Sequence, residues 1–338
     1  MSTVWFCILA LGLSMYAILD GFDLGVGALH LWIARTEDER RTTLNAIGPV
    51  WDGNEVWLIA GGGLLVLSFP RVYAAGFSGF YLALMMVLWL LMGRGLALEW
   101  RANVRNPMWR QAADVVFGVS STLLTVVFGL AVGNVINGVP INPQGYYQGL
   151  FAWMLNPYAL LMGLFSLMLL TLHGANWLAL KTDGPVQERA RLFAARLWFA
   201  LVALVVAATV ATFLTRSEMG INYRTFPPYI LVPLLTAVLL GALWRFRREN
   251  RDLHAFLSSA ALILSLGAST AIGLYPYLLL SRPHPERSFT VTNASSATQS
   301  LVVGLIWLSI GATIAVAHTG FIYYLFRGKV VLEEHGHY

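Results

Sequence analysis

The amino-acid sequence predicts an all-α polytopic membrane protein with nine transmembrane helices. Hydrophobic residues make up 57% and charged residues 12% of its 338 residues, and the mean hydropathy is +0.66. Soluble domains contain about 25% charged residues, so this composition excludes an ordinary soluble protein. Apolar runs long enough to cross a bilayer recur along the chain, and basic residues gather in alternate loops between them.

Each predicted span corresponds to one apolar run, and the runs begin near Val4, Ile47, Gly76, Ala113, Ala152, Arg191, Pro228, Ala255 and Ser300. The first run has no basic residue ahead of it and is longer than the apolar part of a signal peptide, so we expect a retained helix. The run from Ile47 is the most polar, because it carries Asp52 and Glu55 and then three consecutive glycines.

We expect a single membrane domain over residues 1–338, since no linker rich in Gly, Pro or Ser divides the sequence. The segments GLSMYAILDG and GLFSLMLLTLHG are similar, which suggests an internal repeat. The predicted organisation is a four-helix unit with a polar layer at 1–137, a second four-helix unit at 150–281 and a peripheral ninth helix at 300–327. Only the first unit has acidic residues within its spans; the second has His173 and Asn176 instead.

Basic residues indicate the orientation of the helices. The richer set of loops holds Arg35, Arg40 and Arg41; Arg101, Arg105 and Arg110; Lys181, Arg189 and Arg191; Arg245, Arg247, Arg248 and Arg251; and Arg327 and Lys329. The alternate loops hold only Arg71, Arg216, Arg224, Arg282 and Arg287. The positive-inside rule then places the N-terminus outside and the C-terminus in the cytoplasm. The net charge of +5 therefore reflects topology, and we expect no nucleic-acid partner.

Four carboxylates interrupt the first two spans, namely Asp20, Asp23, Asp52 and Glu55. A charged side chain at the centre of a bilayer costs roughly 2.5 to 3.5 kcal/mol, so these groups must be paired, hydrated or protonated. A spacing of three residues puts each pair on one helix face, where it can line the interior of a bundle. Acidic residues in such places are typical of ion and proton routes, and we predict a proton pathway.

Arg94 is the predicted counter-ion of these carboxylates. Glu99 and Asp114 lie at the cytoplasmic ends of the third and fourth spans, so the topology puts all of these residues in one layer near the inner side of the membrane. We predict that Glu99 and Asp114 also belong to the proton pathway, where protons could enter it, although they are explained equally well as side chains at helix ends that reach water. Asn54 is explained equally well as a residue that forms hydrogen bonds between helices.

Histidine and cysteine do not indicate a cofactor in this chain. Only His173 and His318 lie well within predicted spans, and a lone histidine there is better explained as a polar contact than as a haem ligand. The single cysteine, Cys7, excludes an internal disulfide and a cysteine-based metal motif. The tail EEHGHY could bind a metal weakly, but a solvated terminus explains it better. We therefore expect no metal and no defined cofactor site.

The sequence closely resembles subunit II of the cytochrome bd-type quinol oxidases, including the cyanide-insensitive variants, in the segments DGFDLGVG, WDGNEVWL and FPRVYAAGFSGFYLAL. Arg94 and the stretch from Trp109 to Asp114 extend the resemblance. These motifs cover the first four spans, and the remainder agrees in length, span number and orientation.

The resemblance implies a complex in a bacterial inner membrane that oxidises quinol and reduces dioxygen to water, with protons taken from the cytoplasm. It implies a partner, subunit I, that carries two b-type haems, the d-type haem and the quinol site, whereas subunit II ligates no haem. It also implies that Asp23, Arg94 and Asp114 support assembly or haem retention and that Asp52 relays protons. A bound quinone, bound lipid and a small single-span subunit are left open.

Two other functions are compatible with the sequence. A proton-coupled secondary transporter also places acidic residues among its helices and often contains repeats, but it should carry a substrate site in both units. A purely structural partner subunit would use the polar layer for assembly alone. The surplus ninth helix and the uncharged spans of the second unit favour an oxidase subunit over a transporter.

Overall fold

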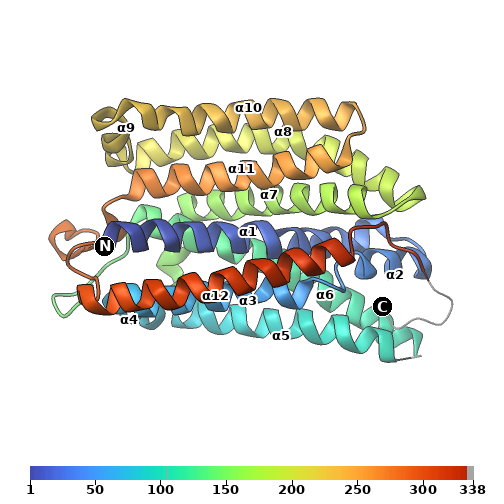
Figure 1. Cartoon of the computed structure of the whole chain (residues 1–338), viewed down its shortest axis with the longest axis horizontal. Coiled ribbons are helices and arrows are strands. Elements are labelled where there is room, and N and C mark those ends of the chain that lie inside the picture. The colour runs from blue at the N-terminus through green and yellow to red at the C-terminus, as the bar shows by residue number, and fades with distance from the viewer. Residues whose placement is uncertain (105, 333–338) are drawn as a thin grey trace.

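The computed structural model describes residues 1–104 and 106–332 and is a bundle of long helices that run along one common direction (Figure 1). Arg105 and the tail EEHGHY at 333–338, both considered above, lie outside the described residues. The helices are α1 (Ser2–Ile33), α2 (Glu37–Asn45), α3 (Trp51–Ser68), α4 (Pro70–Gly79), α5 (Tyr81–Asn103), α6 (Pro107–Asn137), α7 (Pro157–Lys181), α8 (Gly184–Thr215), α9 (Ile221–Thr225), α10 (Leu231–Arg248), α11 (Asp252–Leu274) and α12 (Thr298–Leu325).

Short elements complete the fold outside the long helices. The strands β1 (Tyr277–Leu279) and β2 (Phe289–Thr290) pair antiparallel in the connection from α11 to α12. Short 3-10 helices lie at Phe151–Leu155, Ser217–Gly220, Pro227–Ile230 and Pro285–Arg287.

Among the described residues, eight helices are long and apolar enough to cross a membrane: α1, α5, α6, α7, α8, α10, α11 and α12. They correspond to eight of the nine predicted spans. The remaining predicted span, from Ile47, forms α3, which has 18 residues but is too polar to meet the same measure, because Asp52 and Glu55 lie in its first turns. The helix ends at Ser68, and Pro70, which lacks a backbone N–H, begins α4.

The two sets of loops lie at opposite ends of the bundle. α2 lies at the end away from the N-terminus (Figure 1), and there Glu39 of α2 binds Arg189 at the start of α8. At the other end, the guanidinium of Arg282 donates to Thr215 O at 2.7 Å, which ties the connection before α12 to the end of α8. Loops that are distant in the sequence therefore meet at each end, with the basic-rich set gathered around α2.

α1 lies at the centre and packs against α3, α6, α7 and α11. Its backbone touches that of α7: a Cβ on Gly25 would lie 2.0 Å from Leu170 O, and a Cβ on Gly174 would lie 2.4 Å from Val26 N. Only glycine permits this approach. Membrane helices commonly pack through small residues, because lipid surrounds them with apolar atoms and so provides no hydrophobic force between helices.

α7, α8, α10 and α11 lie together on one side of α1, while α3 and α5 lie on the other (Figure 1). α6 packs against both α5 and α7. α12 runs along the bundle and buries little of itself, since only Leu301 and Gly304 are buried in it. Both of its ends are tied down: Trp5 Nε1 donates to Leu301 O at 3.1 Å, and the Lys181 ammonium donates to Gly328 O at 2.7 Å.

Gly174→Leu should destabilise the bundle, because even its Cβ would overlap the backbone of α1. Overpacking a well-packed site costs about 1 to 3 kcal/mol, and a contact with backbone belongs at the upper end of that range. The thermal unfolding midpoint of the purified protein in detergent should fall. Gly241→Leu on α10 is the matched control, since a Cβ there meets nothing within 4 Å. Equal midpoints for the two variants would contradict the importance of this contact.

Candidate functional site

The polar residues predicted to form one layer are divided between two clusters. The first, here the Arg94 cluster, contains Asp20, Asp23, Asn54, Glu55, Arg94 and Tyr323. The second, here the Asp114 cluster, contains His30, Arg40, Arg101 and Asp114. Both contain residues of α1 and α5. Of the residues in the predicted layer, Asp20, Asp23, Glu55 and Arg94 belong to the first cluster and Asp114 belongs to the second.

Arg94 is fully buried on α5 and joins three helices. Its Nη2 lies 2.7 Å from Asp20 Oδ1 on α1 and 3.3 Å from Glu55 Oε1 on α3. Two unit charges about 4 Å apart attract by about 4 kcal/mol at an effective dielectric constant near 20. Because removal of either partner leaves an uncompensated buried charge, this contact holds α1, α3 and α5 in register.

Asp23 is 1% exposed and connects the same site to α12. Its Oδ2 accepts a hydrogen bond from Asn54 Nδ2 at 2.8 Å, and Asn54 Oδ1 accepts one from the Tyr323 hydroxyl at 2.9 Å. Tyr323 lies 269 positions after Asn54 in the sequence, and no local pattern pointed to it. The ninth predicted helix is therefore part of the site.

The Arg94 cluster has three carboxyl groups and one guanidinium. Asp23 Oδ1 and the Nε and Nη1 atoms of Arg94 are buried without a hydrogen-bond partner among the described residues. If every carboxyl group were ionised, the buried cluster would hold two uncompensated negative charges, which is costly in a membrane. A protonated carboxyl group in this cluster would lower that cost.

Asp52 and Glu99 lie at the margins of this cluster. Asp52 is exposed on the first turn of α3, and Glu55, one turn later on the same face, has a side chain that is 21% exposed. Asp20, next to Arg94, is completely buried, so exposure falls steadily along this row of carboxyl groups. Glu99 lies half-buried on α5, a little more than one turn after Arg94.

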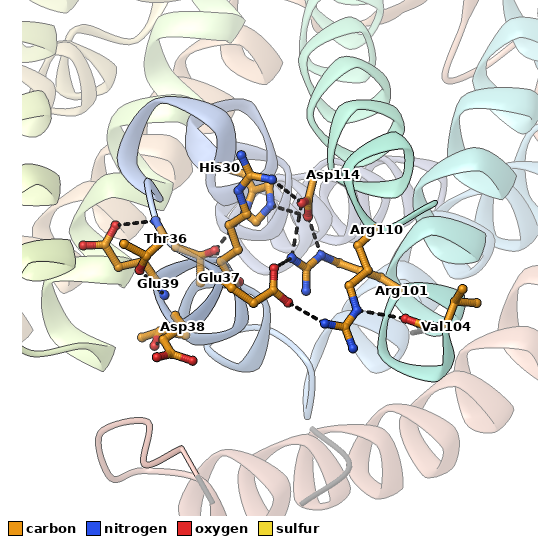
Figure 2. Close-up of polar contacts among 12 residues, drawn as sticks. His30, Thr36, Glu37, Asp38, Glu39, Arg101, Val104, Arg110 and Asp114 are labelled. Atoms are coloured by element: carbon orange, nitrogen blue, oxygen red, sulfur yellow. Dashed lines mark hydrogen bonds and ion pairs between the residues drawn. The ribbon is translucent and has the colours of Figure 1, made fainter. Parts of the chain in front are cut away.

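Asp114 is completely buried on α6 and binds three nitrogen-bearing side chains (Figure 2). Its Oδ1 accepts from His30 Nε2 at 2.9 Å, and its Oδ2 accepts from Arg40 Nη1 at 2.8 Å. Arg101 contacts both oxygens, with Nη2 3.2 Å from Oδ2. This bidentate, charge-assisted arrangement keeps the carboxylate ionised and joins α1, α2, α5 and α6.

Further residues support the Asp114 cluster from α2. Arg101 Nη2 lies 3.0 Å from Glu37 Oε2, and Arg110 Nη1 lies 3.3 Å from Glu37 Oε1. His30 Nδ1 lies 2.7 Å from Thr43 Oγ1, so both ring nitrogens of His30 have partners. The sequence interpretation placed His30 outside the spans, whereas it lies within α1 and is buried. Its spacing of seven from Asp23 was the available signal, because residues seven apart share a helix face.

Glu39 connects α2 to α8 through Arg189. Burial favours its protonated form, but the hydrogen bonds from the Arg35 backbone N–H and the Arg189 guanidinium outweigh that effect and lower the pKa of Glu39. The same side chain completes a capping box with Thr36 at the start of α2.

His173, which the sequence placed within a span, forms hydrogen bonds through both ring nitrogens. His173 lies 2.7 Å from Ser259 Oγ through Nδ1 and 3.0 Å from Ile18 O through Nε2, so both ring nitrogens are engaged, as they are in His30. Its ring stacks on Phe256. The described residues contain no group of three or more His, Cys, Asp or Glu side chains arranged to hold a metal.

Asp114→Asn should destabilise the protein, because it leaves the guanidinium groups of Arg40 and Arg101 without their buried counter-charge. Loss of one partner from a buried ion pair costs about 3 to 5 kcal/mol. The thermal midpoint should fall well below that of Asp38→Asn, a matched control at an exposed position on α2. Equal midpoints would show that Asp114 does not hold these helices together.

Glu39→Gln should make the stability of α2 less dependent on pH. A carboxyl group whose pKa is lowered on folding contributes stability above its unfolded pKa of about 4.3, and that contribution is lost as the pH falls through the folded pKa. Hydrogen-exchange protection factors of α2 in the wild type should therefore decrease between about pH 6 and pH 3.5. In Glu39→Gln the protection factors of α2 should be lower than in the wild type at about pH 6 and should decrease less as the pH falls. The same pH dependence in the variant and the wild type would contradict the stabilising role of Glu39.

Comparison with known proteins agrees with the resemblance seen in the motifs. Residues 1–326 match the family model described as cytochrome bd terminal oxidase subunit II. The chain is 35% identical to a probable cytochrome oxidase subunit 2 from Haemophilus influenzae, covering 97% of this chain and 94% of the relative. It is 30% identical to the cytochrome bd-I ubiquinol oxidase subunit 2 of Escherichia coli K12, covering 98% and 95% of the two chains.

A further relative and a solved structure extend the comparison. The chain is 32% identical to the cytochrome bd ubiquinol oxidase subunit 2 of Bacillus subtilis, covering 98% of this chain and 97% of the relative. Its fold matches a chain in the structure of bd oxidase from Geobacillus thermodenitrificans with a TM-score of 0.77 and 18% identity, covering 96% and 98% of the two chains. The resemblance predicted from the sequence is confirmed. This multi-pass membrane protein belongs to the cytochrome bd terminal oxidase subunit II family.

Proposed function

We propose that the chain is the second subunit of a respiratory quinol:oxygen oxidoreductase and that its buried carboxyl groups supply protons for the reduction of dioxygen to water. The full-length similarity to relatives named as ubiquinol oxidase subunits supports this function. Haems of b and d type in a partner subunit I would carry the electrons. The single observation that carries the proton role is the Arg94 cluster, in which one guanidinium serves three buried or half-buried carboxyl groups.

We also propose that α3 is the ninth transmembrane helix. Its 18 residues are about 27 Å long at 1.5 Å per residue, close to the hydrocarbon thickness of about 30 Å. In its polar first turns, Glu55 lies against Arg94 and Asn54 against Asp23, which lowers the cost of placing these two side chains in a membrane. The small buried surface of α12 supports a peripheral helix at 300–327 beside the proposed units at 1–137 and 150–281.

The proposed orientation puts the α2 end in the cytoplasm, within a bacterial inner membrane. Its support is the gathering of the basic-rich loops at that end of the bundle, as the positive-inside rule requires. Asp20 and Glu55 lie in the halves of α1 and α3 that are nearer this end. Protons taken up there would enter the Arg94 cluster without crossing the whole membrane.

The proposed route follows the fall in exposure from Asp52 through Glu55 to Asp20, with Asp23 and Asn54 beside it. Successive carboxyl groups can pass a proton when side chains or water lie within hydrogen-bonding distance. Glu99 on α5 is a further proposed mouth of this route. Asp52, at the exposed surface of α3, is the proposed point at which a proton passes between this chain and its surroundings, including the partner subunit.

Asp114 has a different proposed role. Its carboxylate is bound by Arg40, Arg101 and His30 at once, and such a group gives up its charge reluctantly. We therefore propose that Asp114 supports assembly, as the family resemblance implies, and that it does not carry protons.

Glu55→Gln and Asp52→Asn test the route. Each keeps the shape of the side chain but removes the acidic proton, and Arg94 keeps its contact with Asp20 in both. Loss of one proton-transfer group typically costs about 100-fold or more in rate, so steady-state oxygen consumption with quinol should fall at least about tenfold. The haem absorption spectrum of the purified complex should stay normal.

Asp38→Asn is the control for these variants, because Asp38 lies exposed on α2 outside both clusters. Its complex should consume oxygen at the wild-type rate. Oxygen consumption at the wild-type rate in both Glu55→Gln and Asp52→Asn would contradict the proposed proton route and favour a purely structural subunit. Proton-coupled uptake of a solute by the isolated chain would instead favour a transporter.

A further inference from the structure

A pocket of about 480 Å³ lies beside the Asp114 cluster, on its outer side. It is lined by Arg35, Thr36, Glu37, Arg40, Pro107, Arg110 and Gln111. These residues come from the first turn of α2 and the residues just before it, and from the first turns of α6. Figure 2 shows Glu37 and Arg110 facing each other at this place.

The pocket is basic. Three guanidinium groups line it against one carboxylate, and Glu37 is already bound by Arg101 and Arg110. The side chain of Arg35 is exposed and has no ion pair or hydrogen bond within the described part of the chain. Arg40 uses Nη1 for Asp114, while its Nε is buried without a partner among the described residues. Guanidinium donors therefore remain for an anion.

Backbone geometry adds to this positive field. The N-terminal turn of α6 borders the pocket and has no acidic residue, and the partial positive charge at the start of a helix favours an anion. The planar fork of arginine matches the oxygens of a phosphate group, to which it can donate two parallel hydrogen bonds. The chemistry therefore selects a phosphate rather than a metal or a neutral ligand.

The surroundings of the pocket are apolar and exposed. Trp32, at the end of α1, is 69% exposed, and Met108 and Trp109, next to Pro107 on α6, are 76% and 42% exposed. Exposed tryptophan at helix ends is typical of the interface between lipid headgroups and acyl chains. If Arg35 and Arg110 bind the phosphate of a lipid, these apolar side chains could contact the acyl chains of that lipid.

We propose that this pocket binds the phosphate of an anionic phospholipid in the leaflet at the α2 end of the bundle. Basic pockets between transmembrane helices at the cytoplasmic side suit such headgroups. Arg40 and Glu37 line the pocket and also take part in the contacts that join α1, α2, α5 and α6. A bound lipid therefore stabilises the packing of these four helices. The inference is independent of the proton route, since none of the carboxyl groups in that route lines the pocket.

The test is a titration of the delipidated complex in detergent with short-chain phosphatidylglycerol, with the thermal midpoint as readout. Phosphatidylglycerol should raise the midpoint in a saturable way, whereas short-chain phosphatidylcholine and inorganic phosphate at the same concentrations should not. Arg35→Gln should weaken the apparent affinity by about tenfold, which corresponds to about 1.4 kcal/mol, a size expected for a lost charged hydrogen bond. Arg35→Lys should retain part of the binding.

Arg248→Gln is the matched control, because it removes the same charge from an exposed position at the same end of the bundle, on α10. It should titrate like the wild type. Equal affinities in the wild type and Arg35→Gln would overturn the proposal, as would a response to phosphatidylcholine equal to that for phosphatidylglycerol. Saturation by inorganic phosphate over the same range would show a site for a free anion and would overturn the assignment to lipid.

Discussion

A buried guanidinium that must remain paired constrains the first half of this protein. Arg94 has no access to solvent, so its charge is tolerable only while Asp20 and Glu55 stay within reach. That requirement sets the rotation of α1, α3 and α5 about their axes. It also gives two polar residues at the start of α3 a partner, since Glu55 contacts Arg94 and Asn54 contacts Asp23.

The opposite side of α1 has a complementary constraint. Gly25 meets the backbone of α7 at Gly174, which leaves that side of α1 no room for polar side chains. The acidic residues of α1 are thereby directed toward α3 and α5. One face of α1 therefore packs closely against α7 through small residues, and another face carries the polar site. Both contacts favour the same rotation of α1 about its axis.

The two polar clusters have opposite character although they share helices. The Arg94 cluster has more carboxyl groups than cations. The Asp114 cluster has more cations than carboxylates, a composition that favours the ionised state of Asp114. The two clusters therefore differ in their balance of charge, although both contain residues of α1 and α5.

The sequence by itself determined the apolar runs, the asymmetry of the basic loops and the motifs of the family, because hydropathy and charge are local properties of the chain. It also identified Arg94 as the cation near the acidic residues. Only the tertiary structure decided which groups meet. It divided the predicted layer in two, left Asp52 exposed and brought Tyr323 to Asn54, since helix rotation is set by contacts between residues far apart in the sequence. It likewise showed that the run from Ile47 is a polar helix whose place depends on Arg94, which hydropathy alone could not establish.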